Sequence, residues 1–194
     1  MAVEVGSTVW IMVRSLRTAQ HNRRIGTFTS ASRVTGHVDE LLPFLPNPDW
    51  GVVSPFMLTT TANYLVEYNI ELHRRAYFPT APSRLGCLYV FDSVEEAEKV
   101  AHTPGWPAER FTTARVSTLH ASHRGDMSII THLRHLHVNS MTDPWPFIEA
   151  YWRSEPCPPY ELQKLWSAEW ERTEPVAIWE TLIEGAIEFD VTDG

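Results

Sequence analysis

The acid with the strongest claim to chemistry is Glu180, in an apolar segment near the C-terminal end of the sequence. Strand alternation places Glu180 on one face with Ile178 and Leu182. A carboxylate on an apolar face is costly unless it is paired or functional. We therefore interpret Glu180 as a candidate catalytic acid, with an edge-strand charge or the partner of an arginine as the alternatives.

A second candidate site follows two prolines. Pro79 and Pro82 rigidify a short connector and disfavour helix in the residues just before them. Ser83 and Arg84 then stand at the start of an apolar run, residues 85–91, which is typical of a buried strand. A hydroxyl and a guanidinium at a strand end suit an anionic ligand. The alternative is a plain loop in which Arg84 binds backbone carbonyls.

The third candidate group consists of histidines. Its members are His120, His123, His132, His135 and His137. Imidazole suits zinc, copper or iron, and three histidines leave a coordination position open for water. However, no His-Glu-x-x-His motif accompanies the group, residues 124–126 indicate a turn, and His135 and His137 are expected to share one face of a strand. We predict no metal site and keep a histidine-based metallohydrolase as an alternative.

The elements that must position these residues interleave irregularly, which favours an α+β fold in a single domain, residues 1–194. Strands are predicted for residues 8–14, 85–91 and 112–118, and helices for residues 55–77, 94–101, 144–153 and 159–172. Two short strands around a Glu184–Gly185 turn are predicted between residues 176 and 191. Residues 15–50 are predicted to form a long loop with short elements.

The charged residues of the predicted 55–77 helix lie mostly away from its apolar stripe. They are Glu67, Glu71, Arg74 and Arg75. We expect a solvated face for them, with a favourable four-residue pair between Glu71 and Arg75.

Composition narrows the class of protein. The 194 residues are 43% hydrophobic and 21% charged, as in an ordinary globular chain that buries a substantial core. The formal net charge of −8 argues against a broad nucleic-acid footprint. Cys87 and Cys157 are too few for a disulfide framework, so we expect a reducing cytoplasm. No stretch approaches membrane-spanning length, so we expect no membrane partner.

Two parts of the sequence carry a family likeness. The first contains Arg74-Arg75-Ala76-Tyr77-Phe78-Pro79 and Pro82-Ser83-Arg84, followed by the apolar strand and an acidic helix. The second contains Glu180-x-Leu182-x-x-Gly185-x-Ile187. Over roughly residues 60–101 and 145–191, the chain resembles small ADP-ribosyltransferase-like domains of bacteria and their phages. The Glu180 segment is similar to the one that supplies the catalytic glutamate in that superfamily.

The resemblance implies a split, strongly bent β-sheet core flanked by helices, with NAD held in a cleft as substrate. It implies that Glu180 is the catalytic acid and bonds the ribose 2′-hydroxyl. Ile178 stands where arginine-modifying members carry a further acid or glutamine, so the resemblance does not extend to an arginine acceptor. The residues expected to contact NAD are Arg14, Ser83, Arg84 and Tyr89.

These features predict transfer of ADP-ribose from NAD to a macromolecular acceptor with release of nicotinamide, as in a bacterial or phage effector. A fixed carboxylate stabilises the positive charge that develops on the ribose as the bond to nicotinamide breaks. The acidic balance favours a host protein as acceptor and leaves a nucleic acid open. A non-catalytic protein-binding or inhibitor module is the alternative from another class, because the eight tryptophans are compatible with a recognition surface.

Overall fold

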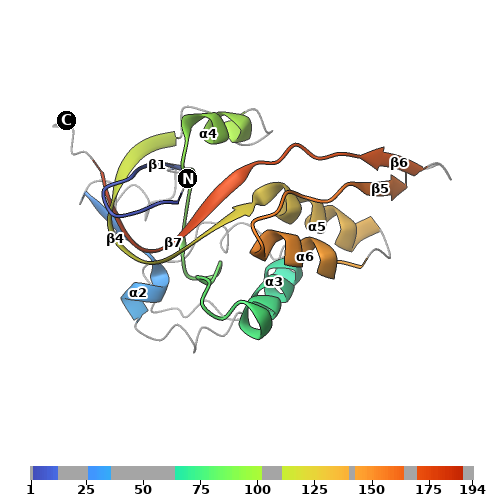
Figure 1. Ribbon diagram of the computed structural model, residues 1–194, viewed down its shortest axis with the longest axis horizontal. Coiled ribbons are helices and arrows are strands. Elements are labelled where there is room, and N and C mark those ends of the chain that lie inside the picture. The colour runs from blue at the N-terminus through green and yellow to red at the C-terminus, as the bar shows by residue number, and fades with distance from the viewer. Residues whose placement is uncertain are drawn as a thin grey trace.

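The computed structural model describes residues 2–12, 26–35, 64–101, 111–139, 143–163 and 170–189. Arg14, one of the residues predicted to contact NAD, lies outside these ranges. Within them, a curved antiparallel sheet occupies one end of the molecule and a group of helices the other (Figure 1). Two long strands run from the sheet toward the helices and join the two ends.

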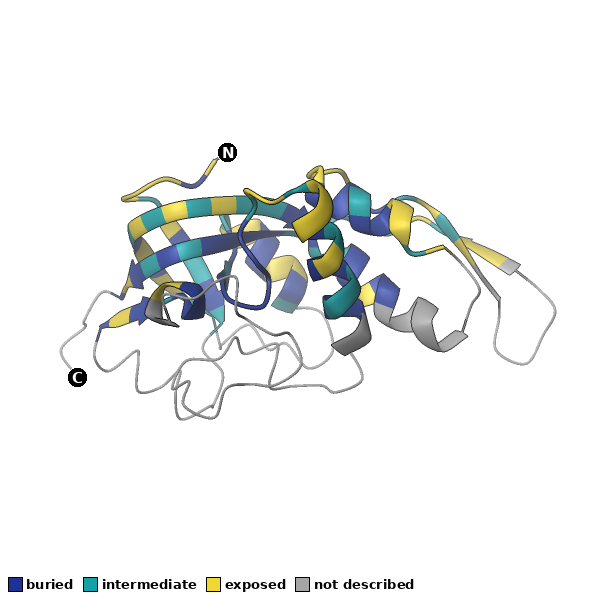
Figure 2. Cartoon of the chain, turned by 90° about the horizontal axis from the view of Figure 1, so that it is seen from below, coloured by how far each residue is buried: buried dark blue, intermediate teal, exposed yellow. Residues whose placement is uncertain are grey.

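Five antiparallel strands form the main sheet. They are β1 (Thr8–Met12), β2 (Thr27–Thr29), β3 (Leu88–Val90), β4 (Phe111–Asp126) and β7 (Trp179–Glu188). The central strand is β7, which pairs with β4 on one side and with β2 and β3 on the other. Burial alternates along much of β4, whereas β7 is buried along most of its length (Figure 2).

The strands β1, β4, β7 and β3 form a closed ring of pairings. β1 pairs with the first part of β4. Trp10 of β1 and Phe91, which directly follows β3, exchange two backbone hydrogen bonds of 2.9 and 2.8 Å, and this bridge links β1 to the end of β3. A cluster of buried apolar side chains draws on all four strands. Its members from these strands are Val9, Ile11, Leu88, Val90, Ala114, Val116, Ile183 and Ile187.

The ring requires β4 to bend. The pairing of β4 with β7 shifts register between Val116 and Thr118 and again between Leu119 and Ala121, as bulges do where a strand changes direction. Gly185 lies opposite these shifts, and a Cβ atom there would lie 2.0 Å from the Thr118 carbonyl oxygen. The prediction of a Glu184–Gly185 turn between two strands was therefore wrong. Gly185 lies inside one continuous strand, where it permits close approach of the backbone of β4.

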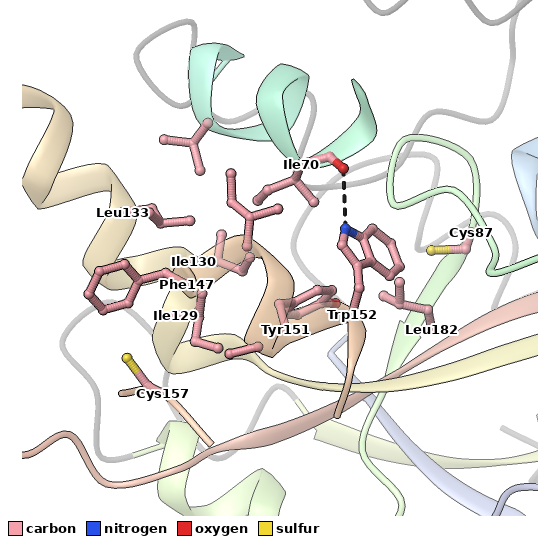
Figure 3. Close-up of a cluster of buried hydrophobic side chains, with 13 residues drawn as sticks. Ile70, Cys87, Ile129, Ile130, Leu133, Phe147, Tyr151, Trp152, Cys157 and Leu182 are labelled. Atoms are coloured by element: carbon pink, nitrogen blue, oxygen red, sulfur yellow. Dashed lines mark hydrogen bonds between the residues drawn. The ribbon is translucent and has the colours of Figure 1, made fainter. Parts of the chain in front are cut away.

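Helices pack beside the sheet. They are α2 (Ala31–Thr35), α3 (Tyr64–Tyr77), α4 (Val94–Ala101), α5 (Met127–Asn139) and α6 (Trp145–Trp152). α3, α5 and α6 share a second buried cluster with Leu182 of β7 (Figure 3). In it, the Trp152 indole N–H donates to the backbone carbonyl of Ile70 at 3.2 Å, which ties α6 to α3.

Several predicted elements agree with the structure. The helix expected at residues 94–101 is α4, and Ser93 Oγ accepts the Glu96 amide at its start. The helix expected at residues 144–153 is α6, within one residue at each end. The strand expected at residues 8–14 is β1 through Met12, and the described part of the 55–77 helix is α3.

The helix predicted for residues 159–172 was wrong. β5 (Tyr160–Gln163) and β6 (Trp170–Thr173) form a two-stranded hairpin that extends away from the helices (Figure 1). Tyr160 pairs with Thr173 and Gln163 with Trp170. Aromatic and β-branched residues favour strands, and their cross-strand pairing overrides the helical spacing of the apolar residues.

The elements predicted around the histidines were also wrong. Residues 124–126 are the end of β4 and not a turn. His135 and His137 belong to α5 and not to a strand. Ile129, Ile130 and Leu133 of α5 are all buried, and this spacing of one and four residues gives a helix its apolar stripe.

Asp126 joins β4, α5 and two other segments. Its buried carboxylate accepts the amides of Ser128, Cys157 and Ile178 at 3.0, 2.8 and 2.9 Å. A buried carboxylate is tolerated when backbone N–H groups satisfy it, and here it also satisfies an amide in the first turn of α5. Asp126 therefore fixes the point at which β4 ends and α5 begins.

The predicted α+β class is confirmed, because an antiparallel sheet and separate helices make up the described residues. None of the helices in these ranges has the length and apolar character needed to span a bilayer.

Candidate functional site

Arg84 is the centre of a buried polar site between the sheet and the helices. Its side chain is 2% exposed. Nε donates to Glu67 Oε2 at 2.9 Å and Nη2 to Glu67 Oε1 at 3.2 Å. Nη1 donates to Glu180 Oε1 and, at 2.5 Å, to the Tyr151 hydroxyl. Arg84 thus binds two carboxylates from elements that are distant in the sequence, and we call Glu67, Arg84, Tyr151 and Glu180 the Arg84 cluster.

Tyr151 reaches this cluster because Gly125 leaves space for its ring. The Tyr151 hydroxyl donates to Glu180 Oε1 at 2.8 Å. Gly125 pairs directly with Glu180 across the β4–β7 ladder. A Cβ atom on Gly125 would lie 2.4 Å from Cε2 of the Tyr151 ring. The absence of a side chain at Gly125 therefore lets Tyr151 of α6 lie over β4 and bond Glu180.

Glu71 is the centre of an adjoining buried group, one helical turn after Glu67. Arg74 donates to it through Nε at 3.0 Å and Nη2 at 2.8 Å. Arg75 Nε donates at 2.8 Å and Ser83 Oγ at 2.9 Å. Arg74 Nη1 also donates to the carbonyl of Ala81 at 2.9 Å. These bonds fasten the proline-containing connector onto α3, and we call Glu71, Arg74, Arg75 and Ser83 the Glu71 cluster.

The electrostatics of both clusters follow from burial and pairing. Burial alone would lower the pKa of Arg84, but the charges of Glu180 and Glu67 hold it well above its usual value. Burial alone would raise the pKa of Glu71, but hydrogen bonds from Arg74, Arg75 and Ser83 lower it. Burial raises the pKa of Tyr151 despite the nearby charge of Arg84. The guanidinium of Arg84 and the carboxylate of Glu71 are therefore charged and the Tyr151 phenol is neutral at physiological pH.

The structure brings together four of the five predicted site residues. Arg84 and Glu180 contact each other directly. Ser83 directs its hydroxyl to Glu71. The Tyr89 hydroxyl donates to the Arg84 carbonyl, and the Arg84 guanidinium carbon lies 4.9 Å from the centre of the Tyr89 ring. Their roles toward NAD stay predictions.

The solvated face predicted for α3 was wrong at three positions. Glu67, Glu71 and Arg74 are only 8, 1 and 6% exposed. Arg84 and the connector pack over this face of the helix and supply its partners. The recurrence of Glu67, Glu71 and Arg74 at positions i, i+4 and i+7 was the available signal, since it places all three on one face. The predicted Glu71–Arg75 pair is confirmed at 2.8 Å.

Sequence reasoning missed Tyr151. It lies in a helix of mostly apolar residues, and nothing in its spacing separates a tyrosine that bonds a carboxylate from one that fills a core. Tyr151 does both, because its ring belongs to the helical core cluster while its hydroxyl bonds Glu180.

His123 and His132 contact aromatic residues. His123 Nε2 lies 2.9 Å from the Tyr151 carbonyl oxygen, and its ring centre is 4.8 Å from that of Trp152. Burial lowers the pKa of His123 to about 4. His132 is buried against Tyr160 and Phe147, while His120 is exposed. In the part of the chain that the structure describes, no three His, Cys, Asp or Glu residues come together as metal ligands would.

The two cysteines are buried and free. Burial raises the pKa of the Cys157 thiol to about 12, and the pKa of Cys87 also rises well above its usual value through burial. Both thiols are therefore protonated at physiological pH, and neither has the thiolate character of a nucleophile.

Residues 47–192 match a family described as a protein of unknown function, DUF2441. The match covers well over half of the chain, so this protein belongs to the DUF2441 family. The matched segment includes Ser83, Arg84, Tyr89 and Glu180 and begins after Arg14. No curated protein matches the chain.

Proposed function

We propose that this chain is an ADP-ribosyltransferase-like enzyme that uses NAD as substrate and has the bent, split sheet of that superfamily. The observation that carries the proposal is the contact of Arg84 with Glu180 on the central strand. The two residues are far apart in the sequence, and each was identified separately as a candidate for chemistry. The closed, bent antiparallel sheet beside helices is compatible with the proposed fold.

The charge of the Arg84 cluster supports a cationic ligand group. Glu67 and Glu180 contribute two negative charges, and Arg84 contributes one positive charge. Buried carboxylates favour a neighbouring group that is positive or becomes positive. The nicotinamide ring of NAD is cationic, and its departure leaves an oxocarbenium-like ribose, so both stages of the proposed reaction suit this end of the site.

The Glu71 cluster is instead rich in guanidinium groups. One carboxylate is shared by the guanidinium groups of Arg74 and Arg75, and the Arg75 side chain is 39% exposed. The partly exposed guanidinium of Arg75 is of the type that binds a phosphate oxyanion. Ser83 and Arg84 are consecutive and join the two clusters. The combined site therefore offers carboxylates at one end and guanidinium groups at the other, which complements the cationic ring and the anionic pyrophosphate of NAD.

In the proposed reaction, the bond between ribose C1′ and the nicotinamide nitrogen breaks, and its electron pair leaves with nicotinamide. A lone pair of the acceptor then forms the new bond to C1′, and the acceptor releases a proton. Glu180 accepts a hydrogen bond from the ribose 2′-hydroxyl and stabilises the positive charge. Because Glu180 is 1% exposed and bound to Arg84 and Tyr151, the proposal requires it to exchange these partners for the ribose.

The acceptor that fits best is a basic protein of the host cytoplasm. With a net charge of −8, the chain attracts basic surfaces and repels the phosphates of nucleic acids. The proposal therefore places the enzyme in the cytoplasm, with protein as the preferred acceptor.

A non-catalytic protein-binding module is the second candidate. The complete pairing of Arg84 with Glu67, Tyr151 and Glu180 favours it. Such pairing also serves a purely structural role, because it satisfies buried charges. In this case the chain keeps the fold and does not bind NAD.

Nicotinamide release tests the proposal. Purified protein is incubated with NAD and a host lysate, and free nicotinamide is quantified by chromatography. We expect release by the native chain and a loss of about 100-fold or more in Glu180→Gln, which removes the stabilising charge. Glu98→Gln, at an exposed position of α4, is the matched control and should leave the rate unchanged.

A thermal shift measurement covers the case in which Glu180→Gln fails to fold. NAD should raise the Tm of the native chain by an amount that grows with NAD concentration, as linkage requires of a native-state ligand. The absence of both nicotinamide release and an NAD-dependent Tm shift would reject the enzyme and favour the binding module.

A further inference from the structure

A groove of about 1080 Å³ lies between α3 and α6, on residues other than those of the Arg84 and Glu71 clusters. Aromatic side chains from both helices line it together with three charged residues of α6 and the segment after it. Two of the aromatic residues are among the most exposed large hydrophobic side chains described, since Tyr77 is 70% and Trp145 is 45% exposed. Exposed aromatic residues that line a concavity are typical of a binding surface.

The aromatic rings lie around His73. Its ring stacks on Trp145 with centres 5.7 Å apart and planes 24° apart, and it lies 4.7 Å from the centre of the Tyr77 ring. Burial lowers the pKa of His73, although the charge of Glu149 opposes this effect. The imidazole is therefore neutral at physiological pH and does not repel a cation. Trp145 and Tyr77 are exposed aromatic residues of the kind that attract cations.

The charged residues of the groove carry a net negative charge. Arg153 donates to Glu149 at 2.6 Å, so this pair is neutral overall. Glu155 also lines the groove. Among the described residues, its carboxylate has no cationic partner. An aromatic surface with a surplus carboxylate at its edge is complementary to a cation that has an apolar stem, as Lys and Arg have.

We propose that this groove binds a lysine or arginine side chain from a basic segment of a partner protein. The apolar stem of that side chain lies along Trp145 and Tyr77, and its charged end faces Glu155. The net charge of −8 steers a basic partner toward the chain. A nucleic acid would also find stacking surfaces here, but the negative rim repels its phosphates.

This inference is independent of NAD chemistry. The groove uses none of the residues of the Arg84 cluster, so a basic segment binds there whether the chain is an enzyme or a binding module. Failure of NAD binding and failure of groove binding are therefore separate results.

Indole signals in ¹H–¹⁵N NMR spectra of the full chain provide the test. Trp145→Phe assigns the Trp145 indole signal among those of the eight tryptophans. The native chain is then titrated with acetyl-Ala-Arg-Ala-amide, and the matched peptides carry Glu or norleucine in place of Arg. We expect a saturable shift of the Trp145 signal with the Arg peptide, a weaker effect with norleucine and none with Glu.

Variants identify the groups that hold the cation. Tyr77→Ala should weaken binding of the Arg peptide about two- to fivefold, the size of one exposed cation–π contact. Glu155→Gln should weaken it by a similar factor, and this effect should disappear at high salt. Glu98→Gln changes the net charge equally and lies on α4, so it should leave binding unchanged.

Three results would overturn the proposal. The Trp145 signal does not shift with the Arg peptide, the Glu and Arg peptides shift it equally, or oligothymidylate shifts it more than the Arg peptide does. Equal shifts would make the groove a purely apolar surface, and the last result would make it a nucleic-acid site.

Discussion

Two interior regions of this protein are buried to the same extent and built from different chemistry. The side chains inside the ring of strands are all apolar, and Val9, Ile183 and Ile187 among them are 0% exposed. The Arg84 cluster is 1–8% exposed in its charged members, yet contains a guanidinium and two carboxylates. Apolar side chains that replace a buried ion pair of similar volume often stabilise a fold equally well. Apolar packing such as that of the ring can therefore hold a fold without buried charges, and the charges of the Arg84 cluster call for a separate explanation.

The largest expected effect comes from removing the cation of the Arg84 cluster. Arg84→Met keeps much of the side-chain volume but leaves Glu67 and Glu180 buried without their shared partner. We expect the free energy of unfolding to fall by about 3–5 kcal/mol, measured by urea denaturation. The triple variant that also carries Glu67→Gln and Glu180→Gln should recover part of this loss. A loss below about 1 kcal/mol for Arg84→Met would show that the cluster is not coupled to folding.

A smaller effect concerns pH. The pKa of His123 is about 4 in the folded chain and 6.5 in the reference state. The unfolded chain therefore binds a proton that the folded chain does not bind, and stability falls as pH decreases from about 6.5 to about 4. Between pH 8 and pH 5 this contributes roughly 2 kcal/mol.

Paired denaturation curves isolate the contribution of His123. His123→Phe keeps an aromatic ring against Trp152 and has no titrating group. Its loss of stability between pH 8 and pH 5 should be smaller than that of the native chain by roughly 2 kcal/mol. Equal losses in both proteins would mean that His123 titrates normally.

The smallest effect belongs to the ring of strands. Ile183→Val removes one methylene from the apolar cluster and should cost about 1 kcal/mol in free energy of unfolding. Because the described members of this cluster include no titratable group, the cost should be the same at pH 5 and pH 8. A cost that changed with pH by more than about 0.5 kcal/mol would contradict the separation of the two regions.

The sequence predicted elements best where local signals and tertiary packing agree. α4 has a Ser93 cap and acidic residues in its first turn, and α6 follows Pro144. Prediction from the sequence failed where long-range strand pairing decides the structure. Nothing local distinguishes Gly185 in a turn from Gly185 against the Thr118 carbonyl, since Thr118 lies more than 60 residues earlier in the chain. The β5–β6 hairpin likewise depends on pairing that the apolar spacing does not encode.

The candidate site was predictable only in part, because a charged residue in an apolar segment is a local signal whereas its partners depend on tertiary packing. A carboxylate beside Ile178 and Leu182 requires a partner, and Arg84 at the start of an apolar segment requires one as well. Glu180 and Arg84 could each be identified from the neighbouring residues in the sequence, and an arginine partner for Glu180 was among the interpretations. Glu67 and Tyr151 were missed because their burial depends on how α3 and α6 pack, which residue type and spacing do not determine.

The central place of β7 has a consequence for synthesis of the protein on the ribosome. β7 pairs with β2, β3 and β4, yet it is the last described strand to emerge. Until then, β3 and the second half of β4 lack this partner strand and have exposed edges. Such edges are sites of aggregation and of chaperone capture. A nascent chain stopped before Trp179 should therefore be bound by chaperones, and release of the chain through Glu188 should end that binding.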